Sequence, residues 1–242
     1  HNIPLEKDPE DRDGIGHIPG LVPDPLFDED TLFLPEDETH AFWITVQPGS
    51  NAVSREYSIR ITIRQDKAKN ISRTVKVKLH NVRIKKRKNF NITHWFYADA
   101  LIDWYKTGLF DRRFWDLLEK YLKNIKDHGQ DTIYVPVFTP PLDGVKRPTQ
   151  LMHVTRTGKN RYRFVWKDVR KYVRLAKKCG ITHFEWCHPF TQWGVKHAIR
   201  VYKGQGENRE LLWKPSVSAT SSVYRAFLSQ YLPQLKRFCE KE

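Results

Sequence analysis

The sequence lacks the signals that mark several common classes of protein. It contains only three cysteines, Cys179, Cys187 and Cys239, and no C-x-x-C pair. An odd number without that spacing argues against a disulfide framework, and we expect buried thiols. No apolar run approaches the ~18 residues that a bilayer-spanning helix needs, so no membrane span is predicted.

The N-terminal region also lacks a recognisable targeting segment. Residues 1–40 are rich in proline and acidic residues and show no hydrophobic period. This composition predicts an extended surface segment rather than a signal peptide, which needs a basic start and an apolar middle. Because the chain begins at His1 rather than Met, we expect a fragment or a processed product.

Acidic residues are scarce relative to basic ones. The chain has 42 Lys and Arg against 28 Asp and Glu, a net charge of +14. Such a charge is compatible with nucleic acid, but the excess is spread singly over predicted polar faces. The one dense run, Lys85–Lys88, is better explained as a solvated linker. A positive field would equally attract an acidic glycan, so no nucleic-acid partner is predicted.

Apolar and polar residues alternate in the first part of the chain. The alternating runs are Ala41–Val46, Tyr57–Arg64 and Val75–His80, and a turn is expected at Pro48–Asn51. A period of two, with apolar residues on one side and mainly polar and basic residues on the other, predicts an antiparallel sheet with one solvated face. About three strands cannot close a sandwich alone. Either more strands precede His1, or this sheet packs against its neighbour.

Strands and helices then alternate along residues 89–242. Strands are expected at Phe90–Tyr97, Thr132–Phe138 and Ile181–Trp186, helices at Phe114–Ile125, Val169–Ala176 and Tyr224–Leu235, and a hairpin at 151–166. Buried strands joined by helices predict a parallel sheet. No G-x-G-x-x-G follows the first strand, so a doubly wound dinucleotide fold is disfavoured and no cofactor is predicted. The pattern predicts an α/β fold of three βα units, which is less than half of an eight-unit barrel.

Local signals define the ends of the predicted helices. Asp111 is placed to cap the first helix, and Gly129 and Gly180 stand where terminating glycines belong. Pro233 lies inside the last helix and is expected to kink or split it.

Polar and aromatic residues gather after each predicted strand, where barrel enzymes place their sites. Aromatic rings stack on the apolar faces of sugars, and planar polar groups hold their hydroxyls, so carbohydrate is the predicted ligand. The candidate substrate-binding residues are Trp95, Asp99, Asp143, Glu185, His188, Gln192, Trp193, Lys196 and His197.

Several of these residues also have purely structural explanations. Asp99 is equally favoured at a helix start, and Asp143 could shape a turn. Trp95 occupies a strand position more typical of core, whereas Trp193 lies beside a glycine in a loop and is the better stacking platform. A functional role is harder to dismiss for Glu185, because a carboxylate on a buried strand must be paired or functional.

A metal site is a weaker interpretation of the same region. His183, Cys187 and His188 supply ligand types suited to zinc. On a strand, however, positions 183 and 187 face one way and position 188 the other. No metal is predicted.

Four segments, taken in order, resemble the catalytic domain of glycoside hydrolase family 123. They are His94–Ala100 (HWFYADA), His128–Gln130 (HGQ), Phe138–Asp143 (FTPPLD) and His188–His197 (HPFTQWGVKH). The block 184–197 carries the most specific part of the resemblance. Residues 19–26 and the sheet after them look like the end of that family's N-terminal sandwich, so the resemblance implies that residues 1–88 are the C-terminal part of a β-sandwich domain.

The resemblance implies that residues 89–242 are the first three units of a (β/α)8 barrel. It also implies a retaining β-N-acetylhexosaminidase that acts on terminal N-acetylgalactosamine-type sugars. In that chemistry the 2-acetamido oxygen of the substrate attacks the anomeric carbon, one carboxylate orients the acetamide, and the next is the general acid and base. The family carries these groups as an adjacent Asp-Glu pair after the fourth barrel strand. This sequence has no matching pair, so we expect the pair after residue 242 and an inactive isolated fragment.

Three alternatives remain open. The chain could be a carbohydrate-binding fragment without catalysis. It could be a glycosidase that uses Asp143 with Glu185, if their carboxyl groups lie ~5–10 Å apart. It could also bind nucleic acid, which its charge alone favours.

Overall fold

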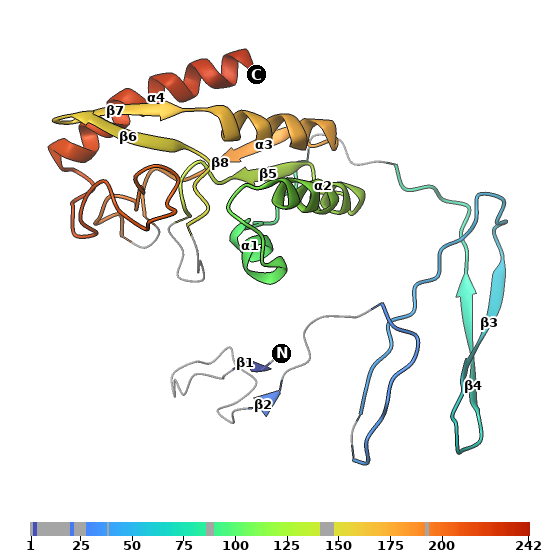
Figure 1. The fold of residues 1–242 in the computed structure, drawn as a ribbon. Coiled ribbons are helices and arrows are strands. Elements are labelled where there is room, and N and C mark those ends of the chain that lie inside the picture. Colours follow the sequence, from blue (N-terminus) through green and yellow to red (C-terminus); the bar gives the residue numbers. More distant parts are fainter. Residues whose placement is uncertain are drawn as a thin grey trace. The chain divides into compact units, whose positions relative to one another are not determined.

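The computed structural model describes residues 2–3, 20–21, 28–37, 39–85, 90–140, 148–191 and 194–242. The chain divides into two compact units, His1–Lys85 and Lys86–Glu242 (Figure 1). The domain boundary expected from the sequence, between residues 88 and 89, falls in 86–89, outside the described residues. Within the described ranges, no helix is both long and apolar enough to cross a membrane.

The first unit is built on one long antiparallel hairpin. Its strands are β1 (Asn2–Ile3), β2 (Gly20–Leu21), β3 (Glu56–Ile63) and β4 (Ile71–Lys78), paired β1 with β2 and β3 with β4. The register of the longer pair runs from Glu56 opposite Lys78 to Ile63 opposite Ile71. The alternating sequence therefore correctly predicted both strands, and the Ala52 amide donates to the Gly49 carbonyl at the expected turn.

The third strand expected in this unit, Ala41–Val46, is wrong. The segment has no ladder partner among the described residues and is irregular. Trp43 is 78% exposed and Ile44 is 54% exposed. Alternation signals a strand only if another strand pairs with it, and the described part of this unit offers none.

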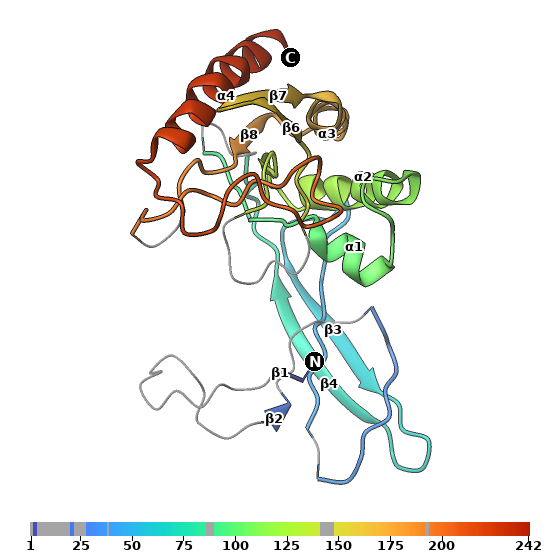
Figure 2. The same ribbon diagram turned by 60° about the vertical axis from the view of Figure 1, so that its left-hand side comes forward.

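The second unit mixes helices with short strands. Its elements are α1 (Asp99–Tyr105), α2 (Arg112–Asp127), β5 (Thr132–Val135), β6 (His153–Gly158), β7 (Arg161–Val165), α3 (Lys167–Lys178), β8 (His183–Trp186) and α4 (Ser222–Lys241). β5 and β8 are parallel, and β6 and β7 form an antiparallel hairpin, as the sequence predicts. Both views show α4 crossing beside that hairpin (Figures 1 and 2).

The first predicted parallel strand, Phe90–Tyr97, does not form. The segment lies beside the start of β5, where the Ile92 carbonyl accepts from the amides of Asp131 and Thr132 at 3.2 Å each. The next hydrogen bonds of this segment are to side chains and not to the backbone of β5. The Asp131 carboxylate accepts from the Ile92 amide at 2.8 Å, and the Gln130 side chain donates to the His94 carbonyl at 3.2 Å. A ladder needs backbone partners at successive positions, and these side chains replace them.

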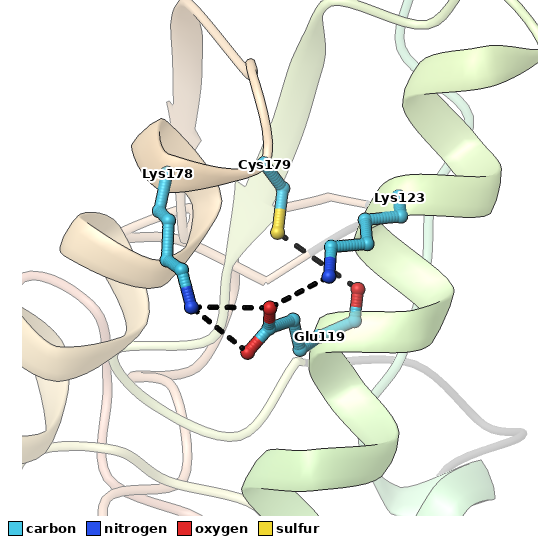
Figure 3. A network of polar contacts seen from close by, with 4 residues as sticks. All are labelled: Glu119, Lys123, Lys178 and Cys179. Atoms are coloured by element: carbon cyan, nitrogen blue, oxygen red, sulfur yellow. Dashed lines mark hydrogen bonds and ion pairs between the residues drawn. The ribbon is translucent and has the colours of Figure 1, made fainter.

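Helix α2 has the ends that its sequence predicts. The Asp111 side chain accepts from the Phe114 amide at 2.7 Å, and Gly129 has a positive φ of 90° just beyond the helix. Its exposed face is tied to α3 through Glu119, which accepts from Lys123 at 2.8 Å and from Lys178 at 3.1 Å (Figure 3). The Cys179 thiol contacts the Glu119 carbonyl from the same side.

Helix α4 supplies much of the core with one face. Its buried members are Tyr224, Phe227, Tyr231 and Phe238, a helical stripe of aromatic rings. Phe227 packs against aromatic rings on other elements, with ring-centroid distances of 5.5 Å to Phe138, 5.3 Å to Tyr162, 5.4 Å to Phe164 and 5.1 Å to Trp213. This ring cluster joins α4 to the hairpin and to the end of β5.

Pro233 does not split α4, contrary to one of the two outcomes expected from the sequence. The helix is continuous from Ser222 to Lys241 with Pro233 inside it. Proline removes the amide that would bond the carbonyl four residues earlier, that of Ser229. Both positions are exposed, so water can satisfy that carbonyl.

The cysteines differ in exposure. Cys179 and Cys187 are buried, as expected, whereas Cys239 is exposed, so the expectation of a buried thiol is wrong there. Cys239 follows the buried Phe238 on α4 and therefore faces away from the core.

Candidate functional site

The candidate site is centred on Glu185, which lies on β8. In the parallel register Glu185 is opposite Tyr134 of β5, so the two side chains share one face of the sheet. The alternate residues, including Trp186, take the opposite face, where the Trp186 ring lies 5.9 Å from Phe238 of α4. The sheet thus directs one carboxylate and one phenol away from the α4 side.

Two side chains hold the Glu185 carboxylate. The indole nitrogen of Trp95 donates to both carboxylate oxygens at 3.1 Å each. His188, three residues further along, places Nε2 at 3.3 Å from one of the oxygens. β8 is half-buried rather than the buried strand expected from the sequence, but its carboxylate is paired.

Aromatic rings surround this carboxylate. The Trp95 ring lies 5.8 Å from the His188 ring and 6.4 Å from that of Tyr97. The Tyr134 ring lies 6.4 Å from His188 and 5.9 Å from Tyr97, both edge-on. Trp95 remains 45% exposed, so part of this aromatic wall meets solvent rather than the core.

Both tyrosines of the wall are held in their neutral form. Burial raises the pKa of Tyr97, and the negative charges of Glu185 and Asp99 raise it further. Burial also raises the pKa of Tyr134, with smaller contributions from Cys187, Tyr97 and Glu185. Both phenols keep their protons at neutral pH and can act as hydrogen-bond donors.

Asp99 is buried at the start of α1, where its side chain is only 6% exposed. Its charge contributes to the raised pKa of Tyr97. The position in the first turn of α1 fits the structural explanation, an acid at a helix start, and a role in binding stays a prediction.

The other predicted residues are placed differently. Asp143, Gln192 and Trp193 lie outside the described residues. Lys196 is exposed, and its carbonyl accepts from the Ala219 amide. The His197 carbonyl accepts from Thr191 Oγ1, and its imidazole Nδ1 is buried with no hydrogen-bond partner among the described atoms. The described contacts of Lys196 and His197 lie within the connection 187–221 and do not reach Glu185.

Sequence reasoning missed Tyr97 and Tyr134. Both were hidden in apolar strand-like runs, where a tyrosine is usually a core residue. A usable signal was nevertheless present, because Tyr97 is two residues from Trp95 and Tyr134 occupies the strand position equivalent to Glu185. In a parallel pair, equivalent positions share a face.

The described residues contain no cluster of three or more His, Cys, Asp or Glu side chains that could hold a metal ion. The zinc alternative considered from the sequence is not assembled there, because the ring nitrogen Nδ1 of His183 lies 2.9 Å from Thr182 Oγ1 and the Cys187 thiol is buried. The arrangement around Glu185 offers a carboxylate acceptor, two neutral phenols, an imidazole and a partly exposed indole. These are the groups that bind sugar hydroxyls and stack on sugar rings.

Comparison with known proteins places this site in a family. The model of the catalytic domain of glycoside hydrolase 123 matches residues 95–242, more than half of the chain. The chain belongs to glycoside hydrolase family 123. The matched region contains every described residue of the wall around Glu185, beginning at Trp95.

A solved structure agrees with the fold of this family 123 chain. It is a family 123 glycoside hydrolase from Clostridium perfringens, described for its hydrolysis of glycolipid glycans, with a TM-score of 0.62 and 14% sequence identity. The match covers 79% of this chain and 35% of that one, so the chain spans about a third of the length of that enzyme. A search of the curated proteins finds no match.

Proposed function

We propose that this chain supplies part of the substrate-binding face of a retaining β-N-acetylhexosaminidase that acts on terminal N-acetylgalactosamine-type sugars. One observation carries the proposal. Trp95 and His188 contact the Glu185 carboxylate through hydrogen bonds, and all three residues lie in the region that matches the catalytic domain. An aromatic face beside a fixed carboxylate suits a sugar that offers hydroxyl and amide donors.

We further propose that the second unit is the opening of a (β/α)8 barrel and the first unit the C-terminal part of a β-sandwich, divided near residues 88 and 89. The parallel pair β5–β8 and the extended segment beside β5 supply three adjacent segments in the order that the first three barrel units require. The carboxyl ends of such strands form the face that carries barrel active sites. His188 and Asp99 follow β8 and the extended segment and fit that face.

In the proposed reaction Glu185 binds substrate and does not attack it. Both of its oxygens already accept from the Trp95 indole, and the remaining lone pairs can accept from a sugar hydroxyl or an acetamide N–H. The acetamido oxygen of the substrate attacks the anomeric carbon, while a carboxylic acid protonates the departing glycosidic oxygen. Water then opens the cyclic intermediate as the same carboxylate removes its proton. We assign these carboxyl roles to an Asp-Glu pair in the parent protein beyond residue 242.

Two alternatives differ in where the catalytic carboxylates lie. If Asp143 and Glu185 form the pair, Glu185 itself would attack or protonate. If no pair exists in the parent, the chain binds carbohydrate without cleaving it.

The parent protein assayed with aryl β-N-acetylgalactosaminide and β-N-acetylglucosaminide separates these possibilities. We expect hydrolysis with retention at the anomeric carbon, a raised KM in Glu185→Gln, and a lost kcat in variants of the Asp-Glu pair. A Glu185→Gln protein whose kcat falls by several orders of magnitude with unchanged KM would instead identify Glu185 as a catalytic carboxylate. A parent without hydrolytic activity would leave only the binding function.

A further inference from the structure

A recess lies between β6 and the loop 203–212, apart from the wall around Glu185. Its volume is about 670 Å³, and it is lined on one side by residues 154–159 and on the other by Lys203, Leu211 and Leu212. It shares no lining residue with the wall around Glu185. Figure 1 shows the loop beside the hairpin β6–β7, and the reciprocal backbone bonds between Val154 and Gly204 join the two.

The loop wall of this recess is held rigidly. The buried Gln150 side chain donates to the carbonyls of Tyr202 and Gly204 at 3.0 and 3.1 Å and accepts from the Tyr202 amide at 3.0 Å. Gln205 donates to the Leu151 carbonyl at 3.0 Å and to the Asp168 carboxylate at 2.8 Å. The recess therefore exists before any ligand arrives, which lowers the entropic cost of binding.

The charge of the recess has one sign. Its ionisable lining residues are Arg156, Lys159 and Lys203, and none of the described residues that line it is acidic or aromatic. Lys203 forms an ion pair with Glu210, which offsets its charge. Among the described residues, no carboxylate contacts Arg156 or Lys159, and the described hydrogen bond of the Arg156 guanidinium is to the Gly158 carbonyl at 3.3 Å. Within the described ranges, Arg156 and Lys159 are thus two cations without a carboxylate partner.

Backbone groups add to this surface. Val154 uses its amide and carbonyl to pair with Gly204, where the pairing ends. In an antiparallel strand the peptide groups of residues i and i+2 point to the same side, so those of Arg156 face the recess as well. The lining also includes the apolar side chains of Val154, Leu211 and Leu212 and the hydroxyl-bearing residues Thr155 and Thr157.

We propose that this recess binds an anionic sugar group, a carboxylate or sulfate ester carried by an acidic glycan. Two uncompensated cations with hydroxyl and peptide donors match a tetrahedral or planar oxyanion. The apolar side chains of the lining can contact the carbon face of the same sugar ring. The absence of aromatic side chains from the described lining disfavours nucleic acid, because single strands are held by base stacking. The proposal rests on the proposed function only in taking the bearer of the anion to be a glycan.

Titration calorimetry on the full 242-residue chain tests this assignment. The probes are 3′-sialyllactose, 3′-sulfolactose and uncharged lactose, which share one disaccharide. We expect both anionic probes to bind and lactose not to bind at this recess. In the double variant Arg156→Gln with Lys159→Gln, affinity for both anionic probes should fall about tenfold or more, because charge-assisted bonds are lost.

The matched control removes the same charge from the exposed face of α2, as Arg113→Gln with Lys120→Gln. Its affinity should stay within about twofold of the wild type, since screening weakens distant surface charges. An equal loss of affinity in both double variants would overturn the proposal. It would show that the anionic probes respond to the positive charge of the whole chain and not to this recess. Equal binding of lactose, or tighter binding of a short single-stranded DNA, would also overturn it. Hydrolysis of neutral aryl hexosaminides by the parent is independent of this result, so the two proposals fail separately.

Discussion

The indole nitrogen of Trp95 donates to both oxygens of Glu185, a residue 90 positions further along the chain. The contact joins the extended segment before α1 to the last short strand of the second unit. It fixes the orientation of the carboxylate, and Trp95 remains 45% exposed. One tryptophan thus serves as a hydrogen-bond donor and presents a surface on which a sugar ring can stack.

Trp95→Phe removes the indole donor and keeps an aromatic face. In the parent enzyme we expect KM to rise several-fold with a smaller change in kcat, because Glu185 is no longer held in position. A net contribution of about 1–3 kcal/mol for a hydrogen bond to a charged group sets the scale. Steady-state kinetics with an aryl hexosaminide measures the effect. Trp104→Phe, at a position that is 71% exposed on α1, is the matched control and should behave as wild type.

Phe227→Ala tests the aromatic core. The side chain is fully buried and touches rings from the hairpin, from the end of β5 and from Trp213. Deleting it should lower the free energy of unfolding of the second unit by about 3–5 kcal/mol. Urea unfolding followed by tryptophan fluorescence reports this. Leu232→Ala on the same helix, at a position 45% exposed, should cost under about 1 kcal/mol. Equal losses would place α4 outside the core.

Glu242 clamps the end of α4 to α3. Its carboxylate accepts from Arg170 at 2.6 Å and from Arg174 at 2.9 Å, and these hydrogen bonds hold its pKa below the ordinary value of 4.5. A carboxyl with a depressed folded-state pKa stabilises the fold above its unfolded value, and that stability is lost as pH falls through the folded value. Glu242→Gln should therefore lower stability at neutral pH by no more than about 1 kcal/mol, since the arginines are partly exposed.

The difference between wild type and Glu242→Gln should shrink below pH of about 4.5 and in high salt. Thermal unfolding across pH 3–7 (roughly the range in which carboxyl groups titrate) provides the measurement. Glu240→Gln is the control, because its ion pair with Lys236 is longer, at 3.9 Å, and exposed. A control variant with the same pH dependence would show that the clamp contributes nothing specific.

The cysteines should react with thiol reagents at different rates. Burial raises the pKa of Cys187 to about 12, and Cys179 is also buried, whereas Cys239 is exposed. Because the thiolate is the reactive form, Cys239 should be labelled first in the native chain and Cys187 only after unfolding. Maleimide labelling followed by peptide mass mapping distinguishes them. Labelling of Cys187 as fast as Cys239 would contradict its burial.

The sequence predicted those elements whose signals are local. Helix α2 followed from the spacing of its apolar face and from Asp111, which does cap it. The strands β5 and β8 followed from apolar runs between helices, and their parallel pairing from the usual handedness of such connections. Glu185 was identified because a carboxylate on such a strand demands a partner.

The errors arise where structure depends on distant partners. Ala41–Val46 alternates like a strand but has no strand beside it in the described part of the chain. Phe90–Tyr97 lies beside β5, yet the Asp131 and Gln130 side chains take the place of backbone partners. Trp95 was a candidate binding residue whose strand position was also typical of core, and its donation to Glu185 is a contact that no local pattern encodes.

Calorimetric titration of the 242-residue chain with N-acetylgalactosamine, for wild type and Glu185→Gln, reports directly whether the wall around Glu185 holds a sugar. We predict measurable binding by the wild type and a loss of about tenfold or more in the variant, with Glu240→Gln unchanged. Equal affinity in wild type and Glu185→Gln would show that the carboxylate held by Trp95 and His188 does not bind carbohydrate.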